Sequence, residues 1–242
     1  MIKNLAKEHK IRLDPDMILT DFEKAEIAAA QRVFKESTLK GCYFHFSKNL
    51  WKRLQKTGLT KGYNKFLKIQ IAFRQTEALA FLPPEDVRKG LAALRGNAPR
   101  SMGDFFDYVD KVYVSGTQKV KRNGEIERTC PRYSPDFWSM KSNTENGYPR
   151  TSNSIEEFHN KFNRLIDKSA SKFYAVVEAF RQEERSTSAD YLRVLQDEPL
   201  SRTTAKNIKR EQKLRKLVET YDKTDVPIFE YLQAVALLLS KK

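Results

Sequence analysis

Cysteines and long apolar runs are both scarce in this chain. Cys42 and Cys130 are the two cysteines among 242 residues, too few for the disulfide framework of a small secreted domain. No apolar run approaches the roughly 20 residues that a membrane-spanning helix needs. The first ten residues hold no apolar segment typical of a signal peptide. We therefore expect an intracellular protein without a membrane partner.

Negative charge is scarce relative to positive charge. Lysine and arginine number 45 against 31 aspartates and glutamates, giving a net charge of +14. Such an excess suits a polyanionic partner, either nucleic acid or an acidic membrane surface, although it also fits a solvated basic surface. The basic clusters Lys119–Arg122 and Lys206–Lys216 are of a type that serves nuclear import but is more often plain surface.

A Cys-x-x-His spacing at Cys42 and His45 raises the question of zinc. Structural zinc takes four ligands, and the whole chain holds two cysteines and three histidines with no second clustered pair. We expect no zinc here. Cys42, on a predicted strand, is more simply a small buried hydrophobe.

The N-terminal part predicts two parallel strands joined by a helix. Residues 1–13 form a short amphipathic pattern that Asp14-Pro15 ends. Met17–Thr20 predicts a buried strand, and Thr20-Asp21-Phe22-Glu23 has the spacing of a helix capping box. Leu39–Phe46 predicts the second strand, with Ser47 capping the next helix. A strand, helix and strand in this order favour adjacent parallel strands.

The rest of the chain predicts helices around one polar stretch. Apolar periodicity predicts helices at residues 63–81, 84–94, 102–114, 154–168, 172–185, 205–221 and 228–239. Residues 115–150 predict a loop, or a hairpin turning at Asn123-Gly124. Residues 186–206, which are rich in serine and threonine, predict a linker.

Asp21 is the first candidate for chemistry. It stands where a predicted strand meets a helix, and ligand groups gather at the carboxyl ends of parallel strands. A carboxylate there suits a hard cation such as Mg²⁺. The alternative is that Asp21 or Thr20 only caps the helix, and position alone favours that alternative.

A second candidate site follows Arg150, whose guanidinium suits a phosphate. Polar residues recur there at helical spacing, apart from the apolar stripe: Glu156, His159, Asn160 and Asn163. One carboxylate, one imidazole and two amides differ from the lysine and glutamate of an ordinary solvated face. A capping role for a glutamate near Asn153 and Ser154 is the alternative.

Three motifs in order resemble the catalytic domain of Mutator-like element (MULE) transposases, over roughly residues 10–185. They are Thr20-Asp21-Phe22-Glu23, Cys42-x-x-His45, and the run from Arg150 to Glu156. The resemblance implies a mostly α protein with a small α/β part, a partial RNase H-like (DDE transposase) fold with a large helical insertion. Its domains would be a partial core at 1–60, a helical insertion and polar loop at 61–150, a returning helix with the DDE-type glutamate at 151–185, and a linker with a basic helical tail at 186–242.

The resemblance also implies roles for single residues. Asp21 and Glu156 would be catalytic and would bind Mg²⁺ or Mn²⁺. Candidate DNA contacts beside them are Cys42, His45, Arg150, Asn153 and His159. The basic tail adds Lys209, Arg210 and Lys213, and the segment Lys119–Arg132 is a further basic contact. DNA is the expected partner and the nucleus the expected location.

The match to the family pattern is incomplete. Ser152 stands where the family has a second asparagine, and Glu157-Phe158 where it has a Gly-Trp type pair. The family's first catalytic aspartate belongs to a segment upstream of residue 1, and two carboxylates are a poor cage for ions about 4 Å apart. We therefore expect a fragment or domesticated derivative that binds DNA without cutting it, or a truncated gene model. The alternative is a non-catalytic helical module that binds a partner protein or a second copy.

Overall fold

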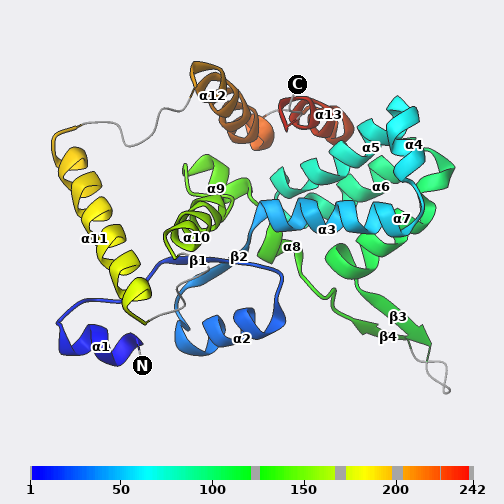
Figure 1. Cartoon of the computed structure of the whole chain (residues 1–242). Coiled ribbons are helices and arrows are strands. Elements are labelled where there is room, and N and C mark those ends of the chain that lie inside the picture. Colours follow the sequence, from blue (N-terminus) through cyan, green and yellow to red (C-terminus); the bar gives the residue numbers. More distant parts are fainter. Residues whose placement is uncertain (1, 121–125, 167–172, 198–203, 224, 240–242) are drawn as a thin grey trace. The chain divides into compact units, whose positions relative to one another are not determined.

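The computed structural model describes residues 2–120, 126–166, 173–197, 204–223 and 225–239. These residues are mostly helical, with two small sheets of two strands each (Figure 1). They form two compact units: residues 1–151 together with 213–242, and residues 152–212. No helix of the described part is both long and apolar enough to cross a membrane.

The first sheet confirms the predicted parallel pair. β1 (Met17–Thr20) follows α1 (Ile2–Glu8), and α2 (Lys24–Val33) connects β1 to β2 (Thr38–Gly41). The register runs from Met17 opposite Thr38 to Thr20 opposite Gly41. Both strands therefore end at the same edge of the sheet, where ligand groups gather in such folds.

Neither Thr20 nor Asp21 caps α2, so the capping alternative is wrong. The helix begins at Lys24, and its N-cap residue Glu23 makes no side-chain capping hydrogen bond. The backbone N–H of Asp21 instead donates to Glu26 Oε2, 3.3 Å away. Three residues thus separate β1 from α2, and they leave the Asp21 carboxylate available for another contact.

The second predicted strand is too long, because β2 ends at Gly41 and residues 43–56 form α3 (Tyr43–Lys56). The fully buried side chains here recur every four residues, at Cys42, Phe46, Leu50 and Leu54. That is a helical period, whereas strand side chains alternate. Cys42 still pairs with β1 through its N–H, which donates to Thr20 O at 2.8 Å.

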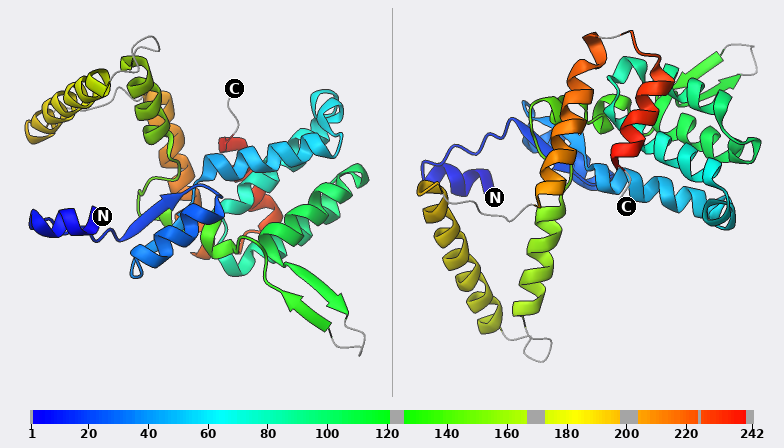
Figure 2. Two further views of the ribbon diagram at one scale, coloured as in Figure 1. Left: turned by 60° about the horizontal axis from the view of Figure 1, so that its bottom comes forward. Right: turned by 90° about the horizontal axis from the view of Figure 1, so that it is seen from above.

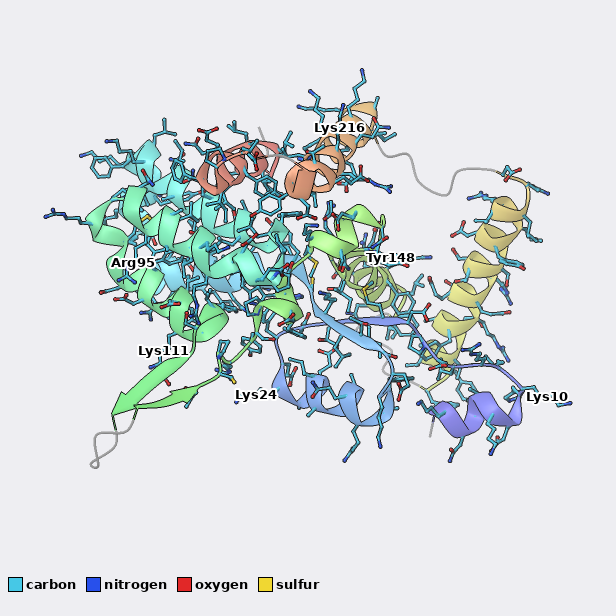
Figure 3. All side chains as sticks on the ribbon, turned by 180° about the vertical axis from the view of Figure 1, so that it is seen from behind. Lys10, Lys24, Arg95, Lys111, Tyr148 and Lys216 are labelled. Carbon is cyan, nitrogen blue, oxygen red and sulfur yellow. The ribbon has the colours of Figure 1, made fainter. Side chains whose placement is uncertain are left out.

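A helical layer carries the core of the first unit. Its elements are α4 (Thr60–Lys65), α5 (Leu67–Ala78), η1 (Leu79–Phe81), η2 (Pro84–Asp86), α6 (Val87–Asn97), η3 (Arg100–Met102), α7 (Gly103–Val109) and η4 (Asp110–Val114). The single helix predicted for residues 63–81 is interrupted at Phe66, whose backbone is extended (φ −116°, ψ 114°). Side chains of α3, α5 and α6 fill the space between these helices (Figure 3).

Residues 115–150 contain the predicted hairpin and two short helices. β3 (Thr117–Val120) pairs antiparallel with β4 (Ile126–Thr129), and the turn at Asn123-Gly124 lies outside the described residues. α8 (Pro135–Trp138) and α9 (Lys141–Glu145) follow. Trp138 is fully buried and stacks on Phe46 with ring centroids 4.6 Å apart. Its indole N–H donates to Tyr113 O at 3.0 Å.

The C-terminal helix belongs to the core of the first unit. α13 (Ile228–Leu239) packs on α5 and α6 (Figure 2). Leu232 and Val235 are fully buried, and the Tyr231 hydroxyl donates to Phe81 O at 2.8 Å. α12 (Ala205–Thr220) precedes the one-turn helix η5 (Tyr221–Lys223) and buries Leu214 and Val218 in the same core cluster.

The second unit contains an antiparallel helix pair. α10 (Asn153–Leu165) packs on α11 (Phe173–Leu195), with the rings of Phe162 and Phe180 4.7 Å apart. The predicted linker is wrong for residues 186–195, which continue α11. The hydroxyls there bond to helical partners: Thr187 Oγ1 donates to Glu183 O at 2.9 Å, and Lys161 Nζ donates to Ser186 Oγ at 3.1 Å. Such bonds let serine and threonine stay in a helix.

Candidate nucleic-acid and metal site

An aspartate–histidine pair stands at the carboxyl end of the parallel sheet. Asp21 follows β1 directly, and His45 lies in the first turn of α3. Asp21 Oδ1 and His45 Nδ1 are 2.7 Å apart. The Asp21 side chain is 46% exposed and that of His45 18% exposed. The carboxylate therefore contacts the imidazole while nearly half of the Asp21 side chain stays exposed to solvent.

Aromatic packing holds the pair in place. Phe22, next to Asp21, and Phe46, next to His45, have ring centroids 6.3 Å apart. Phe22 also meets Tyr133 edge to face at 4.9 Å, and the Tyr133 hydroxyl donates to Phe22 O at 2.6 Å. Asp21 and His45 are each the sequence neighbour of a ring packed in this cluster. The packing of the core therefore sets the distance between the two polar residues.

Gly41 is required by the same cluster. A Cβ atom added at this position would lie 2.6 Å from Phe137 Cε1 and 2.9 Å from Phe22 Cζ. The rings therefore pack directly on the backbone at the end of β2. A side chain here would require Phe137 and Phe22 to shift.

The third motif starts beside the second. The N–H of Tyr43 donates to Arg150 O at 2.8 Å, and Asn143 Nδ2 donates to Pro149 O at 2.8 Å. The Arg150 guanidinium lies 5.7 Å from the centroid of the Phe81 ring. Parts of all three motifs thus meet at the start of α3, although the third lies over 100 residues from the first two in sequence. Cys42 is also there, fully buried, as expected for a small hydrophobe.

A buried carboxyl group behind the site was missed by sequence reasoning. Ser47, inside α3 rather than at its cap, donates a hydrogen bond from Oγ to Glu77 Oε1 on α5. Burial raises the pKa of Glu77, and the bond from Ser47 and the charge of Arg74 offset part of that rise. The pKa of Tyr43 is held well above its usual value by burial and by Glu77, against the charge of Arg150.

Other predicted site residues fall in the second unit or outside the described side chains. Glu156, Asn153 and His159 belong to α10, but their side chains are not among those described. On α12, Lys209 and Lys213 are exposed and Arg210 is half-buried. Lys209 and Arg210 belong to the second unit and Lys213 to the first. The side chains of residues 118–128 also lie outside the described part, whereas Arg132 is exposed. The roles of these residues stay predictions.

The described side chains do not by themselves fit a two-metal centre. Within them no group of three or more histidine, cysteine, aspartate or glutamate residues is placed to hold a metal ion. Asp21 offers one partly exposed carboxylate, and a Mg²⁺ ion held by protein is bound through one or two carboxylates. A second ligand of that kind has to come from residues such as Glu156, and that pairing stays a prediction.

Comparison with known proteins supports the resemblance over the N-terminal part. Residues 1–49 match the family model of the MULE transposase domain. That stretch contains the parallel strands, Asp21 and the Cys-x-x-His motif, whereas the run from Arg150 to Glu156 lies beyond it. No curated protein and no solved structure matches the chain.

Proposed function

We propose that the chain is a transposase-derived DNA-binding protein in which Asp21 and His45 mark the place of the DNA phosphates. The observation that carries this proposal is the Asp21–His45 contact at the end of the parallel sheet, inside the stretch that matches the MULE transposase domain. The net charge of +14 supports a polyanionic partner. In this proposal β1, α2 and β2 are part of an RNase H-like sheet.

Glu156 is proposed as the second metal-binding carboxylate, with Mg²⁺ or Mn²⁺ as the ion. In a complete centre the bound ions would activate a water or a 3′-hydroxyl for attack on a DNA phosphodiester. Asp21 and Glu156 are two carboxylates, fewer than such a cage takes in this family. We therefore propose that these 242 residues bind DNA but do not cut it by themselves.

DNA binding is tested by its dependence on salt. We expect sequence-independent binding with a dissociation constant on the order of 10⁻⁴–10⁻⁶ M at physiological salt, weakening steeply as salt rises, because bound phosphates release counterions. Fluorescence anisotropy of a labelled DNA duplex over a salt series measures both quantities. An affinity that does not change with salt, or no binding at low salt, would show the proposal to be wrong.

Strand cleavage is tested on supercoiled plasmid with Mg²⁺ or Mn²⁺. We expect no nicking by the purified chain. Asp21→Asn is the matched variant, since it removes the carboxylate and keeps the side-chain shape. Metal-dependent nicking that this substitution abolishes would mean that the chain supplies a full set of ligands, and would overturn the proposed inactivity while supporting the site.

A second candidate function is a helical protein-interaction module. The observation that favours it is the set of large exposed apolar side chains on α11, at Phe173, Tyr174, Tyr191, Leu192 and Leu195. Analytical ultracentrifugation separates the two candidates. A chain that self-associates through α11 and binds no DNA at low salt would favour the module over the DNA-binding protein.

A further inference from the structure

A basic groove runs along α3 beside the Asp21–His45 pair. It is a cavity of about 300 Å³ between α3, the α7–η4 helix and the segment after β4. Asn49, Lys52, Arg53, Lys56, Arg132 and Tyr133 line it, together with Phe22 and residues of α7 and η4. We call it the α3 groove. Phe22 follows Asp21 in sequence and also lines the groove. The end of the groove at Phe22 therefore lies next to the Asp21–His45 pair.

The groove is charged in one sense only. Four of its lining residues are lysine or arginine, and none is aspartate or glutamate. Among the described ion pairs, none involves Lys52, Arg53, Lys56 or Arg132. Four cations gathered without a counter-charge repel one another, and a bound polyanion relieves that repulsion.

Two lysines of the groove lie on the same face of α3 as His45. His45, Asn49, Lys52 and Lys56 lie at intervals of four, three and four residues, which places them on one face of α3. From His45 to Lys56 the helix rises about 16 Å. Measured along the axis of a DNA duplex, one strand has a phosphate about every 3.4 Å, so that length corresponds to roughly five phosphates.

Aromatic rings form part of the groove and hold one of its cations in place. The Arg53 guanidinium lies over the Tyr108 ring, 4.6 Å from its centroid. Tyr133 and Tyr113 stack beneath the groove with ring centroids 5.7 Å apart, and both are buried. Burial raises the pKa of Tyr113 far above its usual value, so its hydroxyl stays neutral beside the cations. The cations therefore stand on a rigid aromatic base that belongs to the core.

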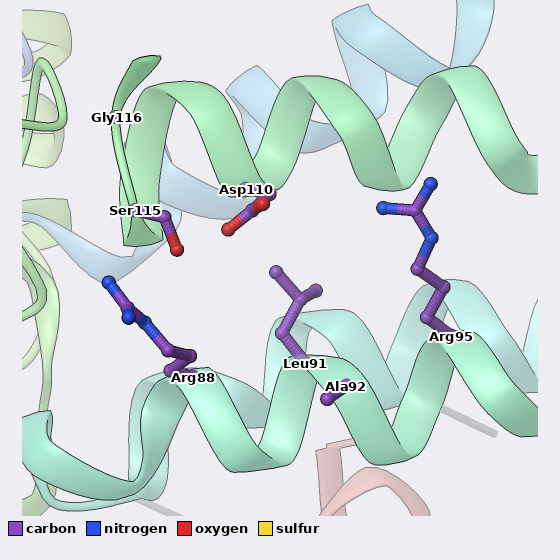
Figure 4. Close-up of a pocket in the computed structure, with 7 residues that line it drawn as sticks. All are labelled: Arg88, Leu91, Ala92, Arg95, Asp110, Ser115 and Gly116. Carbon is purple, nitrogen blue, oxygen red and sulfur yellow. The ribbon is translucent and has the colours of Figure 1, made fainter. Parts of the chain in front are cut away.

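A second cleft in the first unit, between α6 and the α7–η4 helix, does not offer the same chemistry. Its volume is about 490 Å³, and Arg88, Arg95, Asp110 and Ser115 line it (Figure 4). Arg95 is already paired with Asp107, and Asp110 brings a negative charge to the same cleft. The arginines of this cleft are offset by the nearby aspartates, so a bound polyanion would gain little electrostatic free energy there.

We propose that the α3 groove holds the sugar–phosphate backbone of one DNA strand and leads it to the Asp21–His45 pair. This inference rests on the proposed DNA-binding function and specifies where that DNA lies. Lys52, Lys56 and Arg132 contact the phosphates of that strand.

The test compares two double variants of the full chain by anisotropy with the same labelled duplex. Lys52→Ala with Lys56→Ala removes two cations of the groove. Lys61→Ala with Lys68→Ala removes the same charge from exposed lysines of α4 and α5 outside the groove. We expect the groove variant to lower the slope of log affinity against log salt by about 2, or about 0.9 for each lost phosphate contact. The control variant keeps the slope of the parent.

The outcomes separate the two proposals. If the parent binds DNA with steep salt dependence and both double variants behave alike, the groove is wrong and the DNA-binding function stands. If the parent binds no DNA, both are wrong. Circular dichroism and thermal melting check that both variants fold, and Lys52→Gln with Lys56→Gln repeats the test should the alanine variant melt early.

Discussion

Gly41 is a glycine because two aromatic rings occupy the space of its missing side chain. We expect Gly41→Ala to lower the free energy of unfolding by about 1–3 kcal/mol, since a well-packed core accepts extra atoms only by moving side chains or backbone. Urea denaturation measures the change. The matched control is Gly96→Ala on α6, where an added Cβ meets nothing within 4 Å. That variant should keep its stability or gain up to about 1 kcal/mol. Equal loss in both variants would contradict the packing described for Phe22 and Phe137.

Asp21 contributes little to stability although it lies in the site. Its side chain is about half exposed, so its contact with His45 is comparable to a surface ion pair, which is worth up to about 1 kcal/mol. We expect Asp21→Asn to change the free energy of unfolding, measured by urea denaturation, by no more than about 1 kcal/mol. A loss several times larger would mean that the carboxylate is structural, and the variant would no longer serve as a control for cleavage.

Single residues were predictable where a motif fixed them and not where packing did. Asp21 and His45 could be chosen from their motifs, and the structure brings them into contact. Glu77 could not, because its bond with Ser47 joins helices that are 30 residues apart in sequence. The face that Lys52 and Lys56 share with His45 was not predicted. The predicted strand ran to Phe46, which placed His45 on a strand instead of on the same helix as the two lysines.

At the scale of elements, the contact of α3 with α5 carries a pH dependence. Burial raises the pKa of Glu77 above its ordinary value. The folded state therefore holds this proton more tightly than the unfolded state does. The contribution of Glu77 to stability is greatest below its ordinary pKa and is lost as the pH rises through the raised value.

Glu77→Gln tests this contribution, because glutamine keeps an oxygen that accepts the hydrogen bond from Ser47 and never ionises. We expect the variant to gain stability relative to the parent between about pH 4, near the ordinary pKa of glutamate, and about pH 7. Urea denaturation of both proteins across that range gives the difference. Parallel curves for parent and variant would show that Glu77 ionises freely in the fold.

Elements were predictable where one hydrophobic period ran without competition. The parallel order of β1 and β2 and the bounds of α13 follow from such runs. The strand predicted to Phe46 was wrong because an aromatic run favours a strand locally, while the four-residue spacing of buried side chains decided the outcome. α11 runs beyond its predicted end at Arg185 to Leu195. Its hydroxyl groups are accommodated within the helix, as in the bond from Thr187 to the carbonyl of Glu183, so a composition rich in serine and threonine did not mark a linker.

At the scale of the whole molecule, the C-terminal helix completes a core that begins near the N-terminus. Leu232 is fully buried on α13, whereas Leu237 on the same helix is 75% exposed. We expect Leu232→Ala to cost about 2–5 kcal/mol because it leaves a cavity. Leu237→Ala, the matched control, should change stability by less than about 0.5 kcal/mol. Similar small losses in both variants, measured by urea denaturation, would mean that α13 does not pack on α5.

We propose that Asp21 and Glu156 bind their ions at one site on the DNA. Asp21 belongs to the first unit and Glu156 to the second, so the claim concerns how the chain assembles. Spin labels at Glu23→Cys and Glu157→Cys, beside the two carboxylates, in a chain with Cys130→Ser and the buried Cys42 retained, leave both proposed ligands in place. Double electron–electron resonance measures the separation of the labels. Carboxylates that share ions about 4 Å apart should give label distances under roughly 30 Å. A single distribution well beyond that distance, with and without DNA and Mg²⁺, would contradict the claim.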